Sequence, residues 1–249
     1  MRRLGLIGYP LGHSFSKKYY LDKFEREGIE DIAYDLYPLA DITAFPSLYQ
    51  RDGNFYGVNV TIPYKQDVIP YLDELSPEAK EMGAVNCIQI HNKDGKFYLK
   101  GFNTDAFGFE GSLLPLLKPQ HKRALVFGNG GAKKAVTYTL QKLGIPFQIV
   151  SRTKSAENLS YADLDEQLIR NTPLLINCTP LGTYPNVEEC PDIPYEGISA
   201  DHLLYDLIYN PEETLFLKQG KQRGATIKNG YEMLILQAEK NWEIWNQPQ

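Results

Sequence analysis

The sequence contains few cysteines and no long apolar segment. Its three cysteines, Cys87, Cys178 and Cys190, are odd in number and far apart. They match neither a disulfide framework nor the ligand spacing of a zinc site, so we predict no metal, and a reducing cytoplasm as the setting. No apolar run is long enough to cross a membrane and no secretory leader is recognisable, so we expect no membrane partner.

Positive charge is also scarce. The 249 residues include 26 Lys and Arg against 31 Asp and Glu, which gives a formal net charge of −5. Proteins that bind nucleic acid usually present a broad basic face, so we expect no nucleic-acid partner. Internal repeats and low-complexity tracts are absent from the sequence. The length is sufficient for a sizeable core in one large or two small domains.

The most informative segment lies in the middle of the chain. The apolar run Ala124–Phe127 is followed at once by the glycine-rich run Gly128–Ala132, and then by a helical pattern over Lys133–Leu143. Strand, glycine turn and helix form the arrangement that binds a dinucleotide phosphate. Glycines let the backbone approach the ligand, and free N–H groups at the helix start attract an anion. An ordinary strand–helix turn is the alternative interpretation.

The residues after the next strand bear on the choice of cofactor. A second apolar run, Phe147–Val150, completes a βαβ unit. At its end an acidic residue commonly binds the ribose 2′-OH, but here Ser151, Arg152, Thr153 and Lys154 follow. A cation cannot accept that hydrogen bond, whereas it suits a 2′-phosphate. The residues therefore favour NADP over NAD, and a solvated loop charge is the alternative for Arg152.

The first part of the chain alternates strand and helix patterns. We expect strands at 4–8, 33–37, 55–61, 87–90 and 96–100, and helices at 17–26, 42–49, 64–75, 78–82 and 106–117. Asn59, Thr61 and Lys65 would then cluster where a strand passes into a helix, which is where α/β folds bind ligands. Ser16 would cap the first helix, and capping is also the alternative interpretation of Asp105.

The last part of the chain continues this alternation. We expect strands at 174–179, 203–207 and 225–227, a helix starting near Glu212, and a terminal helix at 231–245. In the terminal helix Leu234, Ala238 and Trp242 recur every four residues, which predicts a buried stripe. Gln237 lies beside that stripe, and the sequence leaves open whether it is an interface polar group or a ligand contact.

Nine ordered motifs span nearly the whole chain. They are Ser14–Ser16, Asn59–Lys65, Gly83–Asn86, Asn103–Asp105, Gly128–Ala132, Ser151–Thr153, Asn177–Gly182, Asp206–Pro211, and Gly230–Leu234 with Gln237. Together they resemble the shikimate dehydrogenase family, which includes the quinate/shikimate dehydrogenases. The ordered set is far more specific than any one of its motifs.

The resemblance implies an α/β fold of two domains. An N-terminal mixed α/β catalytic domain would be followed by a Rossmann-like NADP-binding domain, and the C-terminal helix would return to the first. We accordingly assign residues 1–105 with 231–249 to the substrate-binding catalytic domain and residues 106–230 to the NADP-binding domain. The implied reaction is the reversible, NADPH-dependent reduction of 3-dehydroshikimate to shikimate, on the chorismate route to aromatic amino acids.

The resemblance also implies roles for individual residues. Lys65 and Asp105 would be the catalytic pair, and ketone reduction would need Lys65 to donate a proton as the carbonyl becomes an alkoxide. The implied substrate ligands are Ser14, Ser16, Thr61, Asn86, Tyr209 and Gln237. The implied NADP(H) ligands are Gly128, Asn129, Gly130, Gly131, Ala132, Ser151, Arg152, Thr153, Thr179, Leu207 and Gly230.

Three positions depart from the family pattern. Ser151 stands where Asn is usual, Ser155 stands where a second basic residue is common, with Lys154 one step earlier, and Thr183 replaces a frequent Met. A quinate-active or NAD-preferring relative therefore stays open. So does a catalytically silent metabolite-binding relative. A reductase similar to methylene-tetrahydrofolate dehydrogenase would not explain the serine and Asn103–Asp105 motifs together. We expect a monomer or a homodimer.

Overall fold

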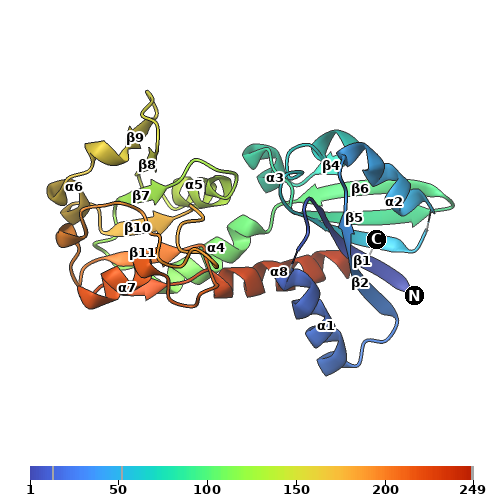
Figure 1. Ribbon diagram of the computed structural model, residues 1–249. Coiled ribbons are helices and arrows are strands. Elements are labelled where there is room, and N and C mark those ends of the chain that lie inside the picture. The colour runs from blue at the N-terminus through green and yellow to red at the C-terminus, as the bar shows by residue number, and fades with distance from the viewer. Residues whose placement is uncertain (13, 52, 248–249) are drawn as a thin grey trace. The chain divides into compact units, whose positions relative to one another are not determined.

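Figure 1 shows the computed structural model, which describes residues 1–249 except 13, 52 and 248–249. The chain forms two compact units, Met1–Asp105 with Gln237–Gln249, and Ala106–Leu236. The second boundary falls inside helix α8 (Tyr231–Trp245), after residue 236, whereas the sequence-based assignment placed it after residue 230. Residues 248–249 of that assignment lie outside the described residues. Because the first unit is interrupted, the chain crosses between the units twice.

The first unit is built on a mixed six-stranded sheet with the order β2-β1-β3-β5-β6-β4. Strand β1 pairs in parallel with β2 and β3, whereas β5 is antiparallel to both β3 and β6. The strands are β1 (Arg2–Gly8), β2 (Ile32–Pro38), β3 (Phe55–Val60), β4 (Glu74–Leu75), β5 (Cys87–Lys93) and β6 (Lys96–Phe102). The helices are α1 (Phe15–Glu27), α2 (Phe45–Arg51) and α3 (Pro77–Met82).

Both faces of this sheet are covered. Side chains alternate between the faces of a strand, so Ile7 packs with one apolar cluster while Leu4 and Leu6 pack with the other. The second cluster contains Trp245 from the end of α8, whose Nε1 donates to the Ile88 carbonyl at 3.0 Å. A Cβ at Gly57 would lie 2.3 Å from the Trp245 ring, so only glycine fits there. The end of α8 is therefore an integral part of the first core.

The second unit is a parallel sheet with the order β12-β11-β10-β7-β8-β9. Read from β9, this is the 3-2-1-4-5-6 order of a dinucleotide-binding fold, whose switch point lies between β7 and β10. The strands are β7 (Ala124–Phe127), β8 (Phe147–Ser151), β9 (Asn158–Ser160), β10 (Leu174–Asn177), β11 (Leu203–Asp206) and β12 (Thr226–Lys228). The helices are α4 (Asp105–Leu113), α5 (Lys133–Lys142), α6 (Glu166–Arg170) and α7 (Leu215–Gln222).

One predicted helix, at 64–75, is wrong. The segment consists of turns, a 3₁₀ helix over Ile69–Tyr71 and the short strand β4. Pro70 lies inside it, and a proline has no N–H with which to continue an α-helix. Lys65 therefore sits on a turn after β3. Its carbonyl accepts a hydrogen bond from the Val85 N–H at 2.7 Å, which fixes that turn against the segment before β5.

Two further expectations about helices need correction. The cap of α1 is Ser14, whose hydroxyl accepts from the Lys17 N–H at 3.3 Å, and Ser16 lies within the helix. On α8 only Ala238 of the predicted stripe is fully buried, whereas Leu234 and Trp242 are half-buried. A spacing of four residues drifts around a helix with 3.6 residues per turn. In the described residues, no helix has the length and apolarity needed to span a membrane.

Candidate active site

The two residues predicted to be catalytic are in contact. The Lys65 Nζ lies 2.6 Å from Asp105 Oδ2. Lys65 comes from the turn after β3, and Asp105 follows β6 as the first residue of α4. Their side chains are 28% and 14% exposed, so the pair is partly shielded from water yet open to a small molecule.

Asn86 joins this pair to a third segment of the first unit. Its amide nitrogen donates to Asp105 Oδ1 at 2.8 Å and to Gln237 Oε1 at 3.2 Å. Its amide oxygen accepts from the Thr104 N–H at 2.8 Å. Four of the predicted residues (Lys65, Asp105, Asn86 and Gln237) therefore belong to one hydrogen-bond network.

Further buried polar groups hold this network in place, and of these Asn59 is the one that the sequence places in a cluster with Lys65. Thr104 donates through its hydroxyl to Asn241 Oδ1 at 2.7 Å. Asn59 donates to the Asn86 carbonyl at 3.2 Å and accepts from the Tyr34 hydroxyl at 2.8 Å. Burial raises the pKa of Tyr34 well above its ordinary value, so its hydroxyl stays a donor. Asn241 had one sequence signal, because it lies one helical turn after Gln237 on α8.

The other predicted substrate residues lie at three places. Ser14 caps α1, and Ser16 is within hydrogen-bond reach of the Tyr34 hydroxyl. Thr61 is held by a bond from its N–H to the Ile7 carbonyl at 2.9 Å, and its hydroxyl has no hydrogen-bond partner among the described residues. Tyr209 belongs to the second unit, where its side chain is 37% exposed after β11.

In the second unit a cavity of about 830 Å³ opens at the carboxyl ends of β7, β8 and β10. This is the switch point of the sheet, where folds of this kind bind their ligands. The predicted residues that line it are Gly128, Asn129, Gly130, Ser151, Arg152, Thr153 and Thr179. Further lining residues, not predicted, are Lys154, Ser155, Glu157, Asn158, Tyr161, Cys178, Pro180 and Leu181.

The glycine turn fits a dinucleotide phosphate. Gly128 has a φ of 106°, and a Cβ there would lie 3.0 Å from the Thr179 methyl, so glycine is required by both conformation and space. At Gly130 and Gly131 an added Cβ would meet nothing within 4 Å, so a ligand can approach the backbone closely. Ala132, at the start of α5, supplies no side-chain cap, which leaves the positive helix end available to an anion.

The loop after β10 is shaped by a buried acid. Asn177 Oδ1 accepts from the Thr179 N–H at 2.9 Å, and its amide donates to Asp206 Oδ1 at 3.1 Å. Asp206 also accepts from the Thr214 hydroxyl at 2.6 Å and the Ile208 N–H at 3.0 Å. Burial raises the pKa of Asp206 to about 6, although these hydrogen bonds oppose the shift.

Leu207 and Gly230, both predicted to line the nicotinamide end, lie against each other. A Cβ at Gly230 would be 2.1 Å from the Leu207 carbonyl oxygen, so no side chain fits at that position. The Leu207 N–H donates to the Asn177 carbonyl at 3.0 Å, which places the pair beside the loop after β10.

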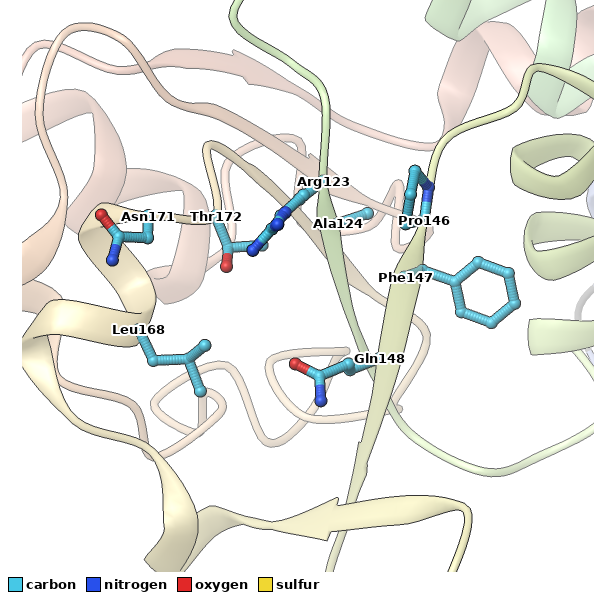
Figure 2. Close-up of a pocket in the computed structure, with 8 residues that line it drawn as sticks. All are labelled: Arg123, Ala124, Pro146, Phe147, Gln148, Leu168, Asn171 and Thr172. Carbon is cyan, nitrogen blue, oxygen red and sulfur yellow. The ribbon is translucent and has the colours of Figure 1, made fainter.

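A smaller cavity of about 400 Å³ lies at the opposite end of the same sheet, where β7 and β8 begin. Figure 2 shows Gln148 of β8 and Leu168 of α6 extending towards each other across it. None of the predicted site residues lines this cavity. The larger cavity is therefore the candidate cofactor site.

Comparison with known proteins agrees with this geometry. A family model described as the shikimate dehydrogenase substrate binding domain matches residues 6–88. A shikimate dehydrogenase (NADP(+)) from Clostridium beijerinckii is 41% identical over 262 residues, covering 100% of this chain and 93% of the relative. The chain belongs to the shikimate dehydrogenase family. The prediction of family is thereby confirmed, and with it that of an oxidoreductase.

Solved structures of shikimate dehydrogenases confirm the α/β, two-domain fold with its Rossmann-like part. Shikimate 5-dehydrogenase from Thermus thermophilus, in complex with NADP(H) and shikimate, superposes with a TM-score of 0.83 at 31% identity, covering 99% of this chain and 94% of that one. Quinate dehydrogenase from Corynebacterium glutamicum, in complex with NAD, gives a TM-score of 0.86 at 26% identity, with 98% and 93% covered.

The described residues contain neither a disulfide nor a cluster of metal-binding side chains. Cys87, Cys178 and Cys190 are all free thiols. Over the residues that the structure describes, no three His, Cys, Asp or Glu side chains group in a way that could hold a metal ion.

Proposed function

We propose that the protein catalyses the reversible, NADPH-dependent reduction of 3-dehydroshikimate to shikimate, on the route to chorismate and the aromatic amino acids. The observation that carries this proposal is the contact of Lys65 with Asp105 at 2.6 Å, inside a network that includes Asn86 and Gln237. Membership of the family supplies the substrate class, and the network supplies groups that can act on it.

The substrate side of the proposal rests on polar side chains fixed before binding. Shikimate is small, anionic and carries several hydroxyl groups. Asn86 is only 4% exposed, and its hydrogen bonds to Asp105, Gln237 and Thr104 fix its orientation before a ligand binds. A buried polar group left without a partner costs roughly 1–3 kcal/mol, so an analogue lacking a hydroxyl is rejected. We assign Ser14, Ser16, Thr61, Asn86, Tyr209 and Gln237 as the substrate ligands.

Lys65 handles the proton in the proposed mechanism. The bound nicotinamide supplies the hydride when the substrate is reduced. As the carbonyl becomes an alkoxide, the Lys65 ammonium donates a proton to that oxygen. Asp105 accepts a hydrogen bond from Lys65 through one oxygen and from Asn86 through the other, so it holds the ammonium in a fixed direction. In the reverse direction the Lys65 nitrogen accepts the proton that the alcohol releases.

The cofactor side rests mainly on the backbone. The open glycines and the uncapped start of α5 bind the pyrophosphate of NADP(H). Arg152 is exposed in the same cavity and forms no ion pair with the described residues, so its charge is available to the 2′-phosphate. We assign the remaining ligands as Asn129, Ala132, Ser151, Thr153, Thr179, Leu207 and Gly230. We also propose a cytoplasmic location, which suits three free thiols, and a monomer or homodimer.

A quinate-active or NAD-preferring enzyme is the second candidate. The observation that favours it is the similarity to the quinate dehydrogenase that was solved with NAD. Lys154 also favours this candidate, because its charge is already paired with Asp163 and is therefore less available to a 2′-phosphate. A catalytically silent relative is less favoured, because the Lys65–Asp105 pair is intact.

A spectrophotometric assay distinguishes these functions. Nicotinamide absorbance is followed with shikimate or quinate, each with NADP or NAD. We expect the fastest turnover with shikimate and NADP. Faster turnover with quinate or NAD would move the protein to the second candidate. A protein that binds NADP but turns over no pair would contradict both and favour the silent relative.

A further inference from the structure

Two cations line the cofactor cavity just after β8, and they differ in their surroundings. Arg152 has no ion pair or side-chain hydrogen bond with the described residues. Lys154 lines the same cavity, but its Nζ lies 2.6 Å from Asp163 Oδ1. Of the two positive charges, one is therefore compensated by the protein itself.

The carboxylate that compensates Lys154 is firmly placed. Asp163 Oδ2 accepts from the Ser160 N–H at 2.8 Å and from the Ser160 hydroxyl at 2.7 Å. The hydrogen bond from Lys154 and those from Ser160 lower the pKa of Asp163 to about 2, so it is ionised under all working conditions. Its side chain is 25% exposed, against 64% for that of Lys154.

Glu157 is an acid that lines the cavity itself, unlike Asp163, and it can be compared with Asp163. Glu157 lines the cavity beside these residues, is exposed, and forms no ion pair with the described part of the chain. Glu157 and Asp163 therefore contribute equal charge to the same region, but only Asp163 holds a lysine.

We propose that Asp163 sets the cofactor discrimination of this enzyme by holding Lys154 out of the group of cations that bind the 2′-phosphate, so that Arg152 acts alone. This inference rests on the proposed function, because it requires NADP(H) in this cavity. A lysine already paired with a carboxylate must exchange that partner for a phosphate, and it gains little by doing so. The enzyme therefore distinguishes NADPH from NADH less strongly than two free cations would allow.

The test uses Asp163→Asn, which removes the charge but keeps an oxygen for Ser160. Binding of adenosine 2′,5′-bisphosphate and of adenosine 5′-monophosphate to the full chain is measured by calorimetry. We expect the affinity for the bisphosphate to rise roughly two- to fivefold, which is what the energy of an exposed charge pair allows. The affinity for the monophosphate should stay constant, because it lacks the 2′-phosphate.

Lys154→Met, placed in two backgrounds, shows whether the lysine is the cause. In the wild-type chain it should change bisphosphate affinity by less than about twofold, because Lys154 is already engaged. In the Asp163→Asn chain it should remove the whole gain. Glu157→Gln is the matched control, because it removes one negative charge from the cavity lining without releasing a lysine. It should change the affinity by less than about twofold.

Two results would overturn the inference. One is a large loss of bisphosphate affinity on Lys154→Met in the wild-type chain, which would mean that Lys154 already binds the phosphate. The other is an equal gain in bisphosphate affinity from Asp163→Asn and Glu157→Gln, which would mean that the change in net charge alone explains the effect. If Asp163→Asn lowers the thermal midpoint too far for use, the Lys154→Met arm decides alone.

The native protein separates this inference from the proposed function. If it binds neither adenosine phosphate, the cofactor part of the proposed function fails. If it binds the bisphosphate, loses that binding with Arg152→Ala and yet shows no response to Asp163→Asn, only the role of Asp163 is refuted.

Discussion

The two units build their candidate sites from different chemical groups, the first from side chains and the second mainly from backbone. In the first unit the site consists of side chains that bind one another, as Lys65, Asp105 and Asn86 do at 2.6–2.8 Å. In the second unit it consists largely of backbone, made accessible by Gly130 and Gly131, and beside it lies Arg152, which forms no ion pair with the described residues. A polyhydroxylated substrate demands fixed donors and acceptors, whereas a pyrophosphate needs open N–H groups. Side-chain changes should therefore break the first site, and backbone changes the second.

The largest effect should come from Lys65→Ala. It removes the proposed proton donor, so kcat for shikimate oxidation should fall about 10²- to 10⁴-fold. The KM for NADP should stay constant, because the proposed cofactor ligands all belong to the other unit. Steady-state kinetics measures both, and Lys80→Ala, which removes an exposed lysine on α3, is the control. A Lys65→Ala enzyme with nearly normal turnover would show that the pair is structural.

The next effect tests the buried side-chain network around Asp206, beside the second site. The pKa of Asp206 is raised to about 6, so the folded protein binds a proton that the unfolded chain releases near pH 4. The contribution of Asp206 to the free energy of unfolding is complete below about pH 4. It is lost as the pH rises through about 6, and the loss amounts to up to about 3 kcal/mol. Asp206→Asn stays neutral and keeps an oxygen for Asn177. Its stability relative to the wild type should therefore increase from pH 4 to pH 6.5.

Denaturant unfolding of both proteins across that range measures the difference. Asp163 titrates lower and is present in both chains, so it cancels from the comparison. A difference that does not change with pH would show that Asp206 titrates as an ordinary exposed acid.

The smallest effect separates two glycines of one turn. Gly128→Ala forces a side chain into a positive φ and against Thr179, and should cost about 1–2 kcal/mol of stability. Gly130→Ala meets open space, so it should leave the thermal midpoint unchanged while weakening NADP binding. Melting curves and cofactor titrations read the two effects separately. Equal loss of stability in both variants would contradict a turn kept open for a ligand.

Local sequence patterns predicted most of the fold. The apolar run Ala124–Phe127, its glycines and the helix after them occur as expected, because turn chemistry and periodicity act over a few residues. The helix expected at 64–75 does not form, because Pro70 lies inside the segment and has no N–H with which to continue an α-helix. Ser14 rather than Ser16 caps α1, and local sequence does not separate the two, because any serine is a good capping residue.

Contacts between distant segments were beyond prediction from local pattern. Family resemblance paired Lys65 with Asp105, but nothing near either residue indicated that Asn241 supports them through Thr104. In the same way, Lys154 reads as a free loop cation until β9 folds back and brings Asp163 to it. Such contacts depend on the tertiary fold, and the sequence around the residues involved carries no pattern that indicates the contact.

The interrupted first unit has a consequence for synthesis of the protein. The second unit is one continuous stretch, Ala106–Leu236, and has its complete sequence before the chain is finished. The first unit begins earlier but still lacks Gln237 and Trp245, the residue that packs against Gly57 and binds the Ile88 carbonyl. Domains fold as units during translation. The segment translated first therefore completes its fold last, and a chain released early carries a finished second unit and an incomplete first unit.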